Sequence, residues 1–69
     1  MNKNFYTVYV VAQNSERWES HVMRVGAYSA ADALQVIRVE MDYRVHEKEI
    51  ISYAVRKLVC GFVFEAVEA

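Results

Sequence analysis

The alternation of apolar and polar positions near the start of the chain predicts a β-hairpin. Residues 5–12, FYTVYVVA, and 18–28, WESHVMRVGAY, are rich in β-branched and aromatic residues, which are typical of strands. The polar, turn-like residues 13–17 separate them, and a connection this short favours antiparallel pairing. Both faces of the first strand are largely apolar, so we expect it to be central, or covered on both sides.

Strand alternation assigns each side chain of this hairpin to one of two faces. One face is predicted to carry Phe5, Thr7, Tyr9 and Val11, with Trp18, Ser20, Val22, Arg24, Gly26 and Tyr28. The other is predicted to carry Tyr6, Val8, Val10 and Ala12, with Glu19, His21, Met23, Val25 and Ala27.

Residues 29–45, SAADALQVIRVEMDYRV, have the 3.6-residue periodicity of a helix. Ser29 is placed as its N-cap, and Asp32 favours the positive end of the helix dipole. We expect the helix to end near Tyr43 or Val45, before a polar loop. One apolar stripe is predicted to pack on the sheet: Ala30, Leu34, Ile37 and Met41. A second stripe lies on nearly the opposite side: Val36, Val39 and Tyr43.

The C-terminal part of the chain leaves two arrangements open. Residues 50–59, IISYAVRKLV, predict a third strand, and residues 62–67, FVFEAV, a fourth, with Cys60-Gly61 as a bend or a bulge. Alternatively, the third strand continues through Gly61 as one kinked ribbon. Either way the expected fold is α+β: one domain over residues 1–69, with a small antiparallel sheet of three to four strands and one helix on one face, ordered ββαβ or ββαββ.

The small size of the chain predicts association with another chain. A 69-residue chain buries only about 60% of its unfolded surface and needs additional support. Cys60 is the only cysteine, so no internal disulfide forms, and Cys60, His21 and His46 lack the spacing of a zinc site. Hydrophobic residues make up 55% of the chain, and five tyrosines, three phenylalanines and one tryptophan exceed what a small core holds.

The second helix stripe is the predicted interface with that chain. Val36, Val39 and Tyr43 are expected to contact a second copy or a protein target; the alternative is that they are unrelated exposed apolar residues. Trp18 joins the candidate interface because tryptophan is common at binding hot spots. A position in the core is the competing interpretation, and the small size of the domain favours it.

The charge balance argues against nucleic acid as a partner. The net charge is −1, and along the sequence the cations alternate with acids: Arg24, Arg38, Arg44, Arg56 and Lys57. A base-stacking sheet stays open as the alternative, with rings drawn from Tyr6, Tyr9, Tyr28, Tyr53 and Phe64. Since no signal peptide or membrane-spanning run is visible, we expect no membrane association and a cytoplasmic location.

Groups that could support catalysis are scattered along the sequence. His46-Glu47 resembles the start of a zinc-peptidase HExxH motif, but Ile50 stands where the second histidine belongs. Cys60 lies among apolar residues and is expected to be buried and inert. The acids Glu47 and Glu49 are expected in a solvated loop. With two isolated glycines, no phosphate-binding loop can be formed, so no cofactor is expected.

The sequence therefore predicts a small non-catalytic protein-interaction module that self-associates, most simply as a dimer. Within that class, a phage or mobile-element accessory protein that inhibits a host protein complex fits the small size. A nucleic-acid-binding sheet is the first alternative. A small oligomeric enzyme with a site between subunits, drawing on His21, His46 and Glu19, is the second.

Overall fold

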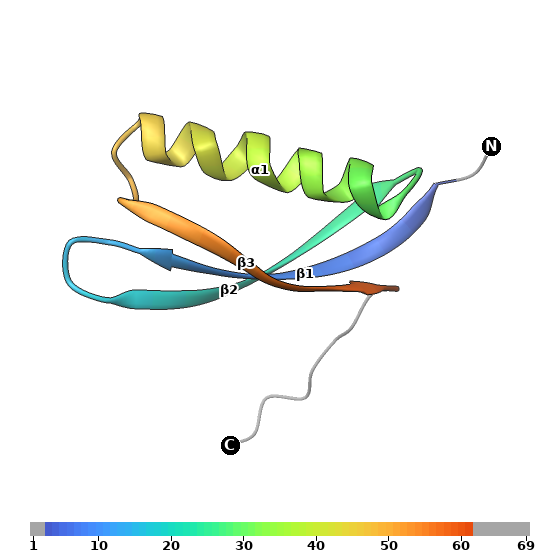
Figure 1. Ribbon diagram of the computed structural model, residues 1–69, viewed down its shortest axis with the longest axis horizontal. Coiled ribbons are helices and arrows are strands. Elements are labelled where there is room, and N and C mark those ends of the chain that lie inside the picture. The colour runs from blue at the N-terminus through green and yellow to red at the C-terminus, as the bar shows by residue number, and fades with distance from the viewer. Residues whose placement is uncertain (1–2, 62–69) are drawn as a thin grey trace, which may run out of the picture.

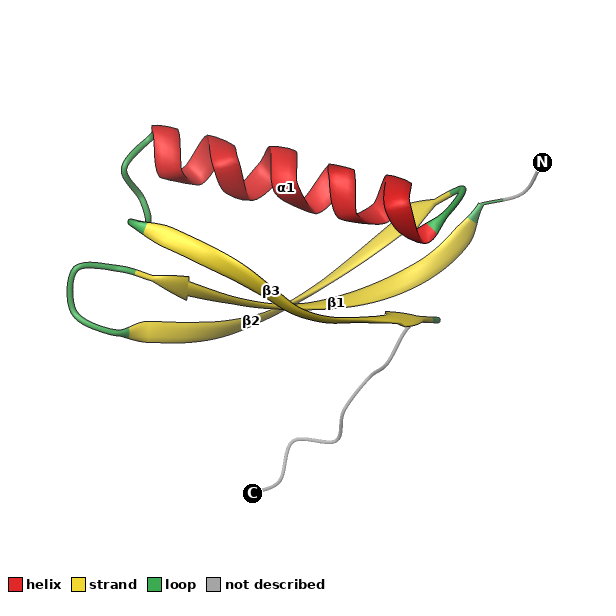
Figure 2. Ribbon diagram, in the orientation of Figure 1, coloured by secondary structure: helices red, strands yellow, loops and turns green. Residues whose placement is uncertain are grey.

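The computed structural model describes residues 3–61 as one three-stranded antiparallel sheet with a helix across one face (Figure 1). The elements are β1 (Asn4–Gln13), β2 (Trp18–Ala27), α1 (Ala30–His46) and β3 (Ser52–Cys60). The strand order is β2-β1-β3, and Figure 2 shows the helix on one side only. The predicted α+β fold is confirmed, as is the central position of the first strand. The predicted fourth strand, 62–67, lies outside the described residues.

The β1–β2 hairpin is held in register by a turn that the sequence encodes. Asn14 accepts hydrogen bonds through Oδ1 from the amides of Glu16 and Arg17, at 2.8 and 2.9 Å. Its own amide donates to the Arg17 carbonyl at 2.9 Å. Asparagine favours such turns because its short side chain replaces a backbone acceptor. The turn sets Gln13 opposite Trp18, and regular pairing continues along the whole length of both strands.

The core lies between α1 and the face of the sheet that the helix covers. Its buried side chains come from all of these elements except β3: Tyr6, Val8, Val10, Ala12, Ala27, Ala33, Ile37 and Met41. The predicted helix stripe is correct for Ile37 and Met41. Ala30 is exposed instead, and Ala33 is fully buried against Tyr6 and Ala27. The buried side of the helix is therefore formed by Ala33, Ile37 and Met41.

Both ends of α1 are satisfied by local hydrogen bonds. Ser29 accepts from the Asp32 amide at 3.1 Å, which confirms the predicted N-cap. The helix ends at His46, slightly later than expected, and the Glu47 amide donates to the Tyr43 carbonyl. Lys48 then adopts a φ of 63° as the chain turns towards β3.

A β-bulge interrupts β3 where it pairs with β1. Tyr9 lies opposite Lys57 and Val10 lies opposite Val55, so Arg56 is an extra residue with no partner on β1. Of the bend or bulge predicted at Cys60-Gly61, the structure shows the bend, because regular pairing continues through Cys60. The chain bends only at Gly61, whose φ of 103° suits glycine.

Candidate functional site

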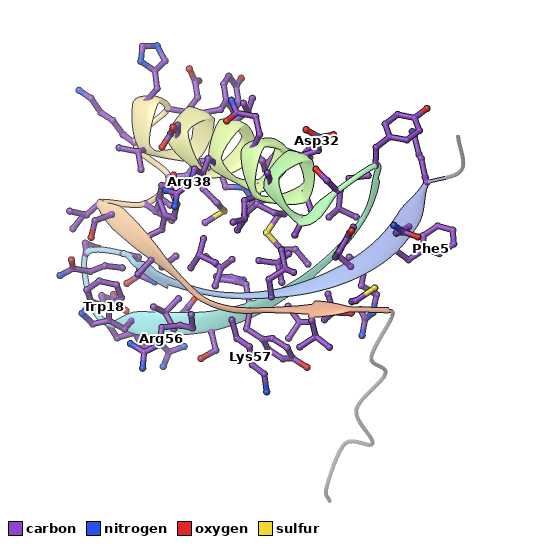
Figure 3. The ribbon with its side chains drawn as sticks, turned by 45° about the vertical axis from the view of Figure 1, so that its right-hand side comes forward. Phe5, Trp18, Asp32, Arg38, Arg56 and Lys57 are labelled. Carbon is purple, nitrogen blue, oxygen red and sulfur yellow. The ribbon has the colours of Figure 1, made fainter. Side chains whose placement is uncertain are left out.

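The side of the sheet that faces away from α1 is not covered by any described helix or strand. We call it the open face. Its residues come from all three strands: Phe5, Thr7, Tyr9, Val11 and Gln13 from β1, Trp18, Ser20, Val22, Arg24 and Gly26 from β2, and Ser52, Ala54, Arg56, Lys57 and Val59 from β3. Figure 3 shows Trp18, Arg56 and Lys57 on this side, with Asp32 and Arg38 on the helix side.

The open face carries positive charge and, within residues 3–61, no carboxylate. Arg24, Arg56 and Lys57 lie on it and are all exposed. The acidic residues in this range lie in the β1–β2 turn, on the helix side of β2, on α1 or after it: Glu16, Glu19, Asp32, Glu40, Asp42, Glu47 and Glu49. The prediction that cations and acids are interleaved is therefore wrong for this surface, because strand pairing separates in space what is mixed in sequence.

The bulge is what places two neighbouring cations together. In a regular strand, consecutive side chains point to opposite faces, so either Arg56 or Lys57 would point towards the helix. With Arg56 as the extra residue, Lys57 keeps its place beside Tyr9 and Arg56 lies with Val11 and Ala54. Both positive groups therefore reach the open face (Figure 3).

Aromatic rings lie at both ends of the open face. Trp18 and Phe5 each expose 54% of their surface. Phe5 pairs with Gly26 and its ring lies beside that glycine, whereas Trp18 lies opposite Gln13 at the other end of β1. The separation along the strand is about 27 Å, from eight steps of about 3.4 Å. Between them, Tyr9 is partly buried, with the Lys57 Nζ 5.8 Å from its ring centroid.

An open cavity lies at the Trp18 end of this face. Its volume is about 410 Å³, and it is lined by residues of all three strands: Val11, Trp18, Ala54 and Arg56. Val11 and Ala54, which pair across β1 and β3, are its apolar lining residues. The cavity therefore joins an aromatic wall, an apolar floor and one positive group.

The four residues of the predicted interface do not form one surface. Val36, Val39 and Tyr43 are 48%, 59% and 57% exposed along the outside of α1, whereas Trp18 lies on the open face. The interpretation that Trp18 belongs to the core is wrong, because its register opposite Gln13 turns it away from the helix.

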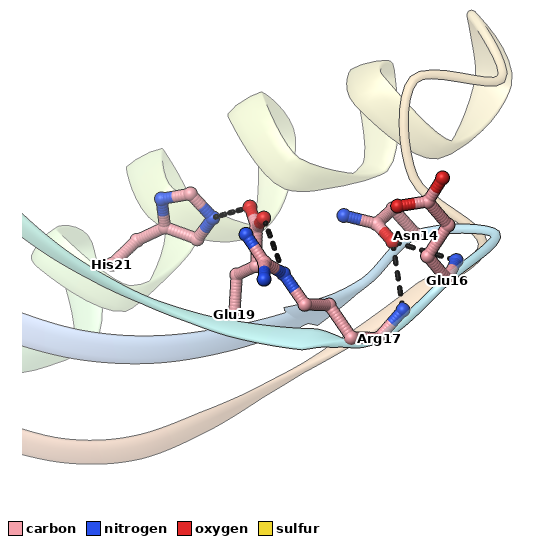
Figure 4. A network of polar contacts seen from close by, with 5 residues as sticks. All are labelled: Asn14, Glu16, Arg17, Glu19 and His21. Atoms are coloured by element: carbon pink, nitrogen blue, oxygen red, sulfur yellow. Dashed lines mark hydrogen bonds and ion pairs between the residues drawn. The ribbon is translucent and has the colours of Figure 1, made fainter.

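The other predicted candidates fall in separate places. His21 lies on the helix side of the edge strand β2, with Nε2 4.0 Å from Glu19 Oε1, and Glu19 also pairs with Arg17 at 3.2 Å (Figure 4). His46 ends α1. Cys60 is exposed, which corrects the expectation of burial: it lies at the end of an edge strand. Among residues 3–61, no group of three or more histidine, cysteine, aspartate or glutamate side chains is placed to hold a metal ion.

Most of the rings expected for base stacking are not on the open face. Tyr6 is buried beneath the helix and Tyr53 packs against the same core. Tyr28 follows β2 and lies beneath the Lys3 Nζ at 5.8 Å, and Phe64 lies outside the described residues. Of that set, Tyr9 lies on the open face within the strands, and Tyr28 lies just beyond the end of β2. The most exposed rings on the open face are Phe5 and Trp18, which strand alternation alone places on one face.

Tyr53 joins β3 to the helix. Its hydroxyl donates a hydrogen bond of 2.7 Å to the Asp42 carboxylate. Burial, and then this hydrogen bond and the negative charge of Asp42, raise the pKa of Tyr53 above the usual 10.0. The neutral phenol is therefore the form that the fold stabilises.

Comparison of the chain with family models, with curated proteins and with solved structures gave no match. In the part of the chain that the structure describes, no helix combines the length and the apolar character required to cross a membrane.

Proposed function

We propose that the protein binds single-stranded nucleic acid on the open face. The observation that carries this proposal is the joint presence of three cations and two well-exposed rings on a surface without described acids. Single-strand binding surfaces combine positive charge for the phosphates with aromatic side chains on which bases stack. A sheet presents such rings to bases that are already unstacked, as those of a single strand are. The role requires binding and no catalytic group.

The same charge distribution disfavours a dimer formed by stacking two open faces. A two-fold interface brings the same patch of each copy together, so Arg56 and Lys57 of one copy would approach the same cations of the other. The edge strands also resist pairing with another copy. β3 carries the bulge, and β2 points Glu19 and His21 towards the helix side.

Binding to labelled oligonucleotides tests the proposal directly. A single-strand-binding fold of this size class covers about 4–16 nucleotides, so an oligothymidylate of about 12 nucleotides is a suitable probe. Fluorescence anisotropy at low salt should show saturable binding that weakens as salt rises, and a duplex of equal length should bind less tightly. No binding at low salt would exclude the proposal, and equal binding to the duplex would contradict stacking.

Self-association through α1 is the second candidate function. It is favoured by the stripe on the outside of α1 formed by Val36, Val39 and Tyr43, each of which exposes about half of its surface. Three side chains are few for a specific interface, which buries about 800 Å² per partner. A dimer formed here would leave both open faces accessible, so it is compatible with nucleic-acid binding. A dimer that binds a host protein complex, as an accessory protein in the cytoplasm, is the more specific form of this candidate.

A further inference from the structure

We infer that the cavity between Trp18 and Arg56 is a nucleobase subsite. A base would stack on the indole of Trp18 over the apolar floor, and the Arg56 guanidinium would contact an adjacent phosphate. This inference rests on the proposed single-strand binding and adds where one base is held.

The construction of the cavity fits a flat, partly apolar group. Its volume of about 410 Å³ lies within the about 300–1,000 Å³ of sites for small organic groups. Val11 from the central strand and Ala54 from β3 form the apolar part, and Trp18 from β2 contributes the aromatic part. Because all three strands contribute, the sheet itself holds these groups in place.

Trp18 is the best placed ring on the open face for stacking. Tyr9 is only partly exposed and has the Lys57 ammonium over its ring. Phe5 packs against Gly26, which occupies part of its surface. Trp18 instead borders a space that already exists, and its neighbour in the cavity, Arg56, brings positive charge to the position where a phosphate follows a stacked base.

Arg56 belongs to the subsite because of the bulge. The extra residue places its guanidinium beside Val11 and Ala54 instead of beneath the helix. Phosphate recognition suits arginine, whose planar fork of N–H donors can engage two oxygens. Stacking on an indole tolerates every base, so the subsite should show little sequence preference.

The single tryptophan makes the subsite directly measurable, since all indole fluorescence comes from Trp18. The full-length protein is titrated with oligothymidylate and with an abasic strand of the same length and charge. We expect the oligothymidylate to quench the fluorescence and to bind about five- to 150-fold more tightly than the abasic strand. The abasic strand should bind through its phosphates without quenching.

Two variants separate the subsite from the rest of the face. Trp18→Ala should reduce oligothymidylate affinity, measured by anisotropy, towards that of the abasic strand. Ala54→Ile fills the cavity with a β-branched residue suited to a strand and retains Trp18 and Arg56. It should reduce both quenching and affinity while circular dichroism stays native-like.

The possible results separate the Trp18 subsite from single-strand binding by the open face as a whole. Equal affinity for the two strands, with unchanged fluorescence, overturns the subsite and leaves single-strand binding intact. Unaltered affinity of Ala54→Ile overturns it as well. Failure of both strands to bind at low salt removes the proposed function, and the subsite with it.

Discussion

Neutralising the cations of the open face should abolish most of the salt dependence of oligonucleotide binding. The perturbation is the triple substitution Arg24→Gln, Arg56→Gln and Lys57→Gln. All three side chains are exposed on one face of the sheet. Their removal takes away charge without opening the core, because none of them is among the buried residues.

The size of the effect follows from counterion release. Each phosphate neutralised on a single strand contributes about −0.7 to the slope of log affinity against log salt. Three cations give a slope of about −2, so raising salt from about 50 to 200 mM should weaken binding about 20-fold. The triple variant should show a much shallower slope and bind weakly even at low salt, because only Lys3, beside Phe5 and Gly26, remains as a cation near this face among residues 3–61.

A matched triple variant on the helix side controls for net charge. Arg38→Gln, Arg44→Gln and Lys48→Gln lowers the net charge from −1 by the same three units, to −4, but changes no residue of the open face. Arg44 loses its exposed ion pair with Glu40, which stabilises by about 0.3–0.5 kcal/mol at most. This variant should keep a slope close to that of the wild type.

Fluorescence anisotropy with labelled oligothymidylate, repeated over a series of salt concentrations, measures both slopes. Equal loss of slope in the two triple variants would refute the reasoning, since it would mean that net charge and not the open face drives binding. An unchanged slope in the open-face variant would refute it too.

Three further substitutions test the core, the contact between β3 and the helix, and the exposed helix stripe formed by Val36, Val39 and Tyr43, here called the outer stripe. Met41→Ala should lower the free energy of unfolding in urea by about 2–5 kcal/mol, because Met41 is 1% exposed, whereas Val36→Ala should change it little. Tyr53→Phe should flatten the alkaline limb of stability: the raised pKa of Tyr53 stabilises the fold below pH 10, and that contribution is lost as pH rises through the folded-state pKa. If Tyr53 does not contribute in this way, urea titrations at about pH 9–11 would give the same pH dependence of the free energy of unfolding for Tyr53→Phe and the wild type. If the outer stripe joins two copies, Val39→Lys should yield monomers with native-like circular dichroism; an unchanged mass by light scattering removes that candidate.

The strands, the hairpin and the helix cap could be predicted because each depends on local chemistry. Apolar and polar residues alternate along β1 and β2, and the observed register keeps the predicted face of each residue that it pairs, from Phe5 to Ala12 and from Trp18 to Ala27. Ser29 and Asn14 bond to backbone atoms within three residues of themselves. Such interactions are visible in a short window of sequence.

The charge of the open face could not be predicted, because it depends on pairing between distant segments. The bulge at Arg56 is set by how β3 fits against β1, and neither strand carries a local signal for it. The exposure of Trp18 follows from its register opposite Gln13, which the length of the turn decides. Arg24, Arg56 and Lys57 are separated along the chain or mixed with acids, and only the pairing of the three strands brings them to one face.

Ultraviolet cross-linking of the protein to oligothymidylate, followed by peptide mass spectrometry, directly identifies the side chains that contact the bases and so tests whether the open face binds them. Zero-length adducts form only where a base touches a side chain. The account predicts adducts on the open-face rings Trp18 and Phe5, which are exposed at its two ends. Adducts confined to Tyr43, which is exposed on the outside of α1, would place the nucleic acid on another surface and contradict binding to the open face.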